Sequence, residues 1–173
     1  MSFKGNNNRH LDFSFERDFN LLYTQVNPVI KTGILKEKKE IQKNKVSNLA
    51  IYEIGSGKLI YFFEEGSIND IKHFFYENSY NEKLEKIDFN KEHYRLSNNV
   101  NIKNRKLANK LFVITEKSER KECELWISSK SGTNRRKINT FPEDTAWRID
   151  VFNKKVLFVM ERENKVEIES FDW

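Results

Sequence analysis

The sequence predicts a mainly β protein built as an antiparallel β-meander, with at most one or two short helices. Short runs in which apolar and polar residues alternate recur along most of the 173 residues, and this period of two is typical of strands. The chain also contains 14 Phe, 6 Tyr and 3 Trp, residue types that favour sheets over helices. With only 2 Pro and 6 Gly, the turns must rely on Asn, Asp and Ser.

The N-terminal third predicts a flexible end followed by three strands. Residues 1–10 are polar, and we expect them to be a flexible N-terminus. The remaining residues, 11–173, are expected to form a single β-rich domain, since this length suits one complete core. Strands are predicted at residues 11–15, 19–26 and 29–35, with Asn27 and Pro28 between the last two.

The next segment contains the clearest hairpin. Residues 36–45 are almost wholly charged, which indicates a solvated hairpin tip or a mobile loop. Residues 49–54 and 58–63 then alternate on either side of Gly55-Ser56-Gly57. Two such runs around a short Gly-rich turn predict a β-hairpin.

Residues 67–89 allow two interpretations. Ser67 followed by Asp70 has the form of a helix start, and Ile68, Ile71 and Phe75 would then share one helical face. Residues 72–76 and 83–89 also fit the two strands of a hairpin. The sequence favours neither interpretation.

The C-terminal half predicts a continuous series of strands. They are expected at residues 111–116, 124–128, 136–140, 147–151, 156–161 and 166–171. Asn153-Lys154 and Glu163-Asn164 supply turn residues between the last three. Both faces of residues 124–128 carry apolar side chains, so this strand should be central and covered on both sides, with Trp126 and Trp147 buried.

An internal repeat suggests a specific architecture. Residues 122–138 resemble residues 45–61, and strand pairs that begin near Phe19, Lys72, Lys110 and Lys155 recur every 40–50 residues. Within residues 110–141, a strand carrying Trp126, a Gly turn and the segment Asn134-Arg-Arg136 resemble a blade of the WD-type β-propellers of the Tol translocation protein kind.

This resemblance implies a propeller-like fold. It implies four blades, with the strand at residues 11–15 completing the last one. The segment at residues 150–155 departs from the repeat, because it lacks the Ser-Pro-Asp-Gly turn that normally opens the next blade. The alternative is a sandwich or a single twisted sheet of hairpins.

Composition restricts the possible functions. The net charge of +5 invites an interpretation as a nucleic-acid-binding protein, yet acidic residues are interspersed with lysines as on an ordinary solvated surface. A single cysteine, Cys123, excludes a disulfide framework within the chain. No segment reaches the ~20 apolar residues of a membrane-spanning helix. We expect a cytoplasmic protein if the chain is full length, and a periplasmic one if a signal peptide has been removed.

No pattern of catalytic or metal-binding residues is present, so we expect neither an enzyme nor a cofactor. His10, His73 and His93 lack the spacing of metal ligands. Cys123 lies between Glu122 and Glu124, whose negative charge should raise the thiol pKa and disfavour a nucleophilic thiolate. Phosphate-binding loops and nucleophile elbows are also missing.

The remaining candidates are binding functions. We expect a non-enzymatic protein-binding module, such as a small inhibitor or an immunity-type protein, whose partner is another protein with an acidic surface. The alternative is a nucleic-acid-binding module that uses two basic clusters at residues 103–106 and 135–137, with nearby tryptophans stacking on bases. The candidate binding residues are Lys103, Arg105, Lys106, Arg135, Arg136 and Lys137.

Overall fold

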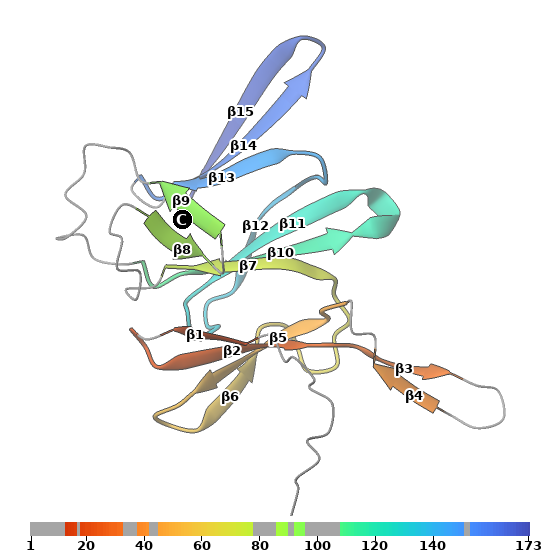
Figure 1. Cartoon of the computed structure of the whole chain (residues 1–173). Helices are drawn as coiled ribbons and strands as arrows, with labels where there is room; N and C mark the ends of the chain where they lie inside the picture. The colour runs from red at the N-terminus through yellow and green to blue at the C-terminus, as the bar shows by residue number, and fades with distance from the viewer. Residues whose placement is uncertain are drawn as a thin grey trace, which may run out of the picture.

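The residues that the structure describes form a stack of three antiparallel sheets and two additional two-stranded ribbons (Figure 1). The computed structural model describes residues 13–16, 18–32, 38–41, 45–77, 86–89, 92–95, 108–150 and 153–173. The predicted flexible N-terminus, residues 1–10, lies outside the described residues. Among the described residues the only helical segment is one 3-10 turn, η2 (Ser118–Arg120). The prediction of a mainly β, antiparallel fold is confirmed.

The first sheet contains the N-terminal strands. Its order is β1-β2-β5-β6, with bounds β1 Phe13–Glu16, β2 Leu21–Val26, β5 Asn48–Glu53 and β6 Lys58–Tyr61. The predicted hairpin around Gly55-Ser56-Gly57 is confirmed as β5 paired with β6. Between β2 and β5 the chain forms a ribbon of β3 (Val29–Thr32) and β4 (Lys38–Ile41). The prediction of a tip or loop over residues 36–45 was therefore wrong at β4, because backbone pairing with β3 does not require apolar side chains.

The middle sheet has the order β12-β11-β10-β7. Its strands are β7 Ile71–Tyr76, β10 Leu111–Lys117, β11 Glu122–Ser128 and β12 Arg136–Pro142. The helix alternative for residues 67–89 is wrong, because β7 pairs with β10. The hairpin alternative placed strands correctly but paired them wrongly, since β8 (Lys86–Phe89) pairs with β9 (Glu92–Arg95).

The third sheet contains the last three strands in the order β13-β14-β15, with bounds β13 Ala146–Asp150, β14 Lys155–Arg162 and β15 Lys165–Asp172. The predicted turn residues fit, because Lys154, Glu163 and Asn164 all have positive φ. The expectation that residues 11–15 complete the last sheet was wrong. Phe13–Glu16 instead pairs with β2 in the first sheet, its neighbour along the chain.

The core consists of two apolar layers, one on each face of the middle sheet. On β7, Phe75 faces the third sheet, whereas Phe74 and Tyr76 face the first sheet. On β11, Leu125 and Ile127 likewise face the third sheet. The prediction that this strand is central and covered on both sides is confirmed. Alternation of side chains produces this arrangement, since every second residue points to the opposite face.

The tryptophans are less buried than the sequence predicted. Trp126 packs against the layer between the first and middle sheets, with its ring edge-on to Phe63 at 5.4 Å. Trp147 packs on Phe75 at 5.1 Å in the other layer. Both side chains are only partly buried, because each lies toward the margin of its layer.

Within the described ranges, the strands assigned to separate repeating units do not all fall in separate sheets. The strands that begin near Lys72 and Lys110 were predicted to open separate units, but as β7 and β10 they are neighbours in one sheet. The relation to a β-propeller blade stays a prediction.

Candidate functional site

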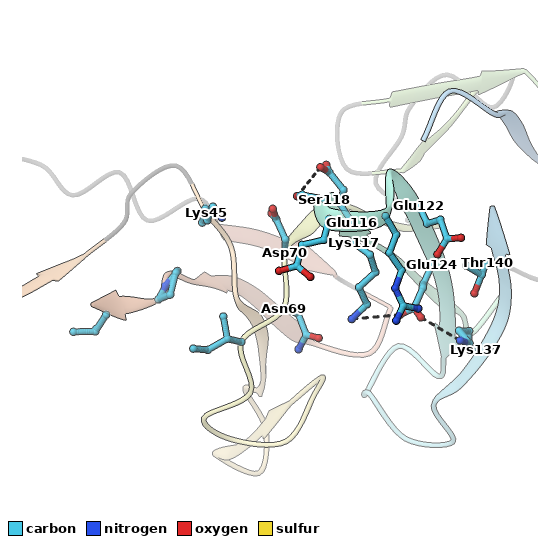
Figure 2. Close-up of a pocket in the computed structure, with 15 residues that line it drawn as sticks. Lys45, Asn69, Asp70, Glu116, Lys117, Ser118, Glu122, Glu124, Lys137 and Thr140 are labelled. Atoms are coloured by element: carbon cyan, nitrogen blue, oxygen red, sulfur yellow. Dashed lines mark hydrogen bonds and ion pairs between the residues drawn. The ribbon is translucent and has the colours of Figure 1, made fainter. Parts of the chain in front are cut away.

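A hollow in the described part of the chain lies where the first and middle sheets separate. It is a cavity of about 970 Å³, bordered by the chain leaving β2, the β6–β7 connection and the β10–β11 turn (Figure 2). A cavity of this size can hold a short segment of a partner chain or a large side chain. We take it as the candidate site.

One wall is formed by two connections that are fixed to each other by backbone hydrogen bonds. The Ser47 N–H and hydroxyl donate to the Val26 carbonyl oxygen at 2.7 and 3.0 Å. The Ile71 N–H donates to the Val46 oxygen at 2.8 Å. Because the bond from Ile71 to Val46 joins the middle sheet to the first sheet, the wall is anchored even though it consists of loops.

The opposite wall continues the face of β11 that carries Trp126. Alternation places Glu122 and Glu124 on that same face, farther from the centre of the sheet than Trp126. In Figure 2 both carboxylates lie beside Lys137 and Thr140 of β12. The apolar layer between the sheets therefore ends at Trp126, and beyond it the gap is lined by charge.

Charges of both signs line the cavity and neutralise one another. The lining contains the carboxylates of Asp70, Glu116, Glu119, Glu122 and Glu124 and the cationic groups of Lys45, Lys117, Arg120 and Lys137. The cavity is thus close to electrically neutral, although the whole chain has a charge of +5. A near-neutral lining gives no strong field for a polyanion.

A three-residue ion cluster joins the first strand of the middle sheet to its neighbour. Lys72 Nζ lies 2.7 Å from Glu116 Oε2 and 3.5 Å from Asp70 Oδ2. The hydrogen bond to Glu116 raises the pKa of Lys72, and the same bond lowers the pKa of Glu116. Ser118 also donates its hydroxyl to Glu116 at 2.9 Å. Lys72 and Glu116 therefore both carry their charges at neutral pH.

The second predicted basic cluster does not converge on one surface. Arg135 donates to the Phe62 carbonyl oxygen, and its guanidinium carbon lies 5.2 Å from the centre of the Phe63 ring. Arg136 donates to the Asp172 carbonyl oxygen at 3.4 Å.

The third member of this cluster lies in the cavity. Lys137 pairs with Glu124 at 3.1 Å, and Lys117 reaches the same carboxylate at 3.9 Å. The first cluster, Lys103, Arg105 and Lys106, lies outside the described residues. The nucleic-acid interface stays a prediction.

An apolar ridge stands at the edge of the cavity. Ile68 is 82% exposed and Val29 is 55% exposed. Together with Pro28 they border both this cavity and a second one of about 320 Å³. We call Pro28, Val29 and Ile68 the ridge. Exposed aliphatic side chains that lie beside a hollow can take part in a contact with another protein.

Sequence reasoning missed the ridge. It placed Ile68 on the buried face of a possible helix, but no helix forms there. The available signal was the isolation of Ile68 among Ser67, Asn69 and Asp70, which is typical of an exposed loop rather than of a strand.

The side chains considered for catalysis show no catalytic arrangement in the described part of the chain. Cys123 is buried, and burial raises its pKa, as do the charges of Glu116 and Glu143. The predicted direction of the shift is confirmed, but the main cause is burial. His73 is exposed and stacks on Phe75. Across the described ranges, no group of three His, Cys, Asp or Glu side chains could hold a metal ion.

Comparison with known proteins gives no relative. The chain matches no model of a protein family, no curated protein and no solved structure. In the part of the chain that the structure describes, no helix has the length and apolar character needed to cross a membrane.

Proposed function

We propose that the protein is a non-enzymatic binding module whose partner is another protein, held at the cavity and the ridge. The observation that carries this proposal is the exposure of Ile68 and Val29 beside a cavity lined by charges of both signs. Apolar anchors surrounded by polar groups are the usual anatomy of a protein–protein contact.

The balance of charge supports a polypeptide partner over a nucleic acid. Affinity for nucleic acid depends on lysines and arginines that neutralise phosphates. Here Lys137 and Lys117 already pair with Glu124, and Lys72 pairs with Glu116. A partner segment with one apolar side chain, flanked by charged residues of both signs, would fit the ridge and the ion pairs better than a phosphate backbone.

Under this proposal the protein could act as a small inhibitor or immunity-type protein. The net charge of +5 would speed association with a partner whose overall surface is acidic. The cavity would then determine where the partner docks, because its fixed walls need little ordering on binding.

The experiment is capture of partners from the native source with three versions of the immobilised protein: wild type, Ile68→Asp and Ile54→Asp. Ile54 is also exposed, at 47%, but borders neither cavity, so it serves as the matched control. We expect wild type and Ile54→Asp to retain the same protein, and Ile68→Asp to lose it at least about tenfold.

Two results would contradict the proposal. One is equal retention by Ile68→Asp and wild type, which would place the contact elsewhere. The other is retention of RNA or DNA that weakens steeply as salt rises, which would favour the nucleic-acid alternative.

A further inference from the structure

The second cavity, of about 320 Å³, has a different lining from the first. Among the described residues that border it, Glu65 is the only one with a charged side chain. The other side chains are either apolar, such as Val26, Pro28 and Val29, or polar without a charge, such as the half-buried Tyr61. The first cavity is close to neutral, whereas the described lining of this one is net negative.

This cavity lies on the outer face of the first sheet, where β2 ends and β5 begins. The register opposes Val26 to Asn48 and Ala50 to Tyr61. On β5 these residues alternate with Leu49, which belongs to the inner apolar layer, so they face away from that layer. The ridge borders this cavity as well as the first one. A partner that contacts the ridge therefore also reaches the second cavity.

Glu65 belongs to a tight turn that is fixed to the first sheet. The turn is closed by a hydrogen bond of 3.0 Å from the Ser67 N–H to the Glu64 carbonyl oxygen. The buried side-chain amide of Asn48 donates to the Phe63 carbonyl oxygen at 3.1 Å and accepts from the Phe63 N–H at 2.9 Å. Because the chain is held to β5 just before the turn, the backbone that carries the exposed Glu65 carboxylate is anchored beside the cavity.

We infer that the second cavity receives an arginine side chain of the partner protein, an assignment that rests on the proposed function. The negative charge of Glu65 favours a cation, and a guanidinium group can form two parallel hydrogen bonds with one carboxylate. The apolar side chains of Val26 and Val29 suit the aliphatic stem of an arginine, which packs on apolar surface while its charged end stays polar. An aromatic ring such as that of Tyr61 also attracts a guanidinium group.

The size of the second cavity suits one long side chain. Its volume of about 320 Å³ is at the lower end of the range for binding pockets, about 300–1,000 Å³. The partner would place an apolar side chain against Ile68 and an arginine beyond it. Since the whole chain has a charge of +5, a local arginine adds little to long-range attraction. Its pairing with Glu65 instead fixes the register of the partner on the ridge.

NMR titration of the full chain with N-acetyl-arginine amide tests the assignment without the partner. The citrulline compound is the matched probe, because it has the same shape and no charge. We expect the amide signals of Gly66 and Ser67 to shift and to saturate at about millimolar arginine probe. The citrulline probe should bind at least about threefold more weakly. Glu65→Gln should weaken binding of the arginine probe by a similar factor, whereas Glu163→Gln, at an exposed turn of the third sheet, should not.

Three results of the titration would overturn the assignment. They are equal binding of the arginine and citrulline probes, equal binding by wild type and Glu65→Gln, and tighter binding of the corresponding lysine compound, which lacks the planar fork of a guanidinium group. Thermal unfolding shows whether each variant is folded, and Glu65→Ser replaces Glu65→Gln if that variant is not.

The titration and the capture experiment fail in different ways. If the arginine probe does not bind but Ile68→Asp still loses the captured protein, the contact at the ridge stands and the arginine assignment is wrong. If the probe binds but Ile68→Asp retains the captured protein, both are overturned, because the cavity then binds arginine without that partner. When both experiments succeed, Glu65→Gln should also retain at least about threefold less of the captured protein than Glu163→Gln does.

Discussion

The fully buried ion pair between Lys130 and Glu16 offers the sharpest test of the structure. Lys130 Nζ lies 2.7 Å from Glu16 Oε1, and neither side chain has any exposed surface. Lys130 belongs to the turn after β11 in the middle sheet, and Glu16 ends β1 in the first sheet. The pair therefore fixes the first strand to the next layer. We predict that Lys130→Met strongly destabilises the protein, because it leaves a carboxylate buried without its cation.

The expected size follows from the remaining partners of Glu16. Removing one member of a buried ion pair typically costs about 3–5 kcal/mol. Glu16 retains the backbone N–H groups of Phe19 at 2.8 Å and Asp18 at 3.3 Å, which offset part of the loss. We therefore expect a decrease of about 3 kcal/mol in the free energy of unfolding. A typical domain has 5–15 kcal/mol in total.

The loss should also depend on pH. Burial raises the pKa of Glu16, while the hydrogen bond and charge of Lys130 act against this rise. Without Lys130 the pKa of Glu16 rises further in the folded protein. The folded variant then binds a proton more tightly than the unfolded chain, so its stability falls as pH rises from the ordinary glutamate value of 4.5 through the folded pKa. Lys130→Met should cost more at pH 8 than at pH 5.

Urea unfolding at pH 5 and pH 8 measures both effects. Lys117→Met is the matched control, since its ammonium group is exposed and lies 3.9 Å from Glu124, so it should cost at most about 1 kcal/mol. The double variant Glu16→Leu/Lys130→Met should be more stable than Lys130→Met alone, because the orphaned charge is gone. The reasoning is refuted if Lys130→Met costs less than about 1 kcal/mol at both pH values.

Three further substitutions or modifications have defined outcomes. Gly132 has a φ of +83°, and an added Cβ would lie 2.8 Å from Ile51 Cδ1. A urea titration of Gly132→Ala should therefore show an unfolding free energy lower by about 1–3 kcal/mol. Trp126→Ala should cost about 3 kcal/mol, the lower end of the range for tryptophan, because the ring is only partly buried against Phe63; an unchanged melting temperature would contradict this. Cys123 should react with iodoacetamide at pH 8 about tenfold more slowly in the folded protein than in urea, because burial raises its thiol pKa. Equal rates in the two states would show that the thiol is accessible.

The positions of most strands could be predicted from the sequence because they depend on local chemistry. Alternation marked the strands of the C-terminal half, and turn residues such as Asn164 marked where they end. The same alternation showed that β11 has two apolar faces and must be covered on both sides. A period of two is visible in any short window, so these features need no knowledge of the rest of the chain.

The pairing of strands and the positions of the ion pair and of the exposed ridge depended on the tertiary structure. Strands of similar pattern can pair in several ways, and only packing selected β10 as the partner of β7. Lys130 and Glu16 lie 114 residues apart, and each alone looks like an ordinary surface charge. Ile68 appeared to belong to a helical face until the connection between two sheets exposed it. Whether a side chain is buried or exposed depends on which sheet or loop packs against it. That packing joins segments far apart in the chain, so it cannot be read from the local sequence.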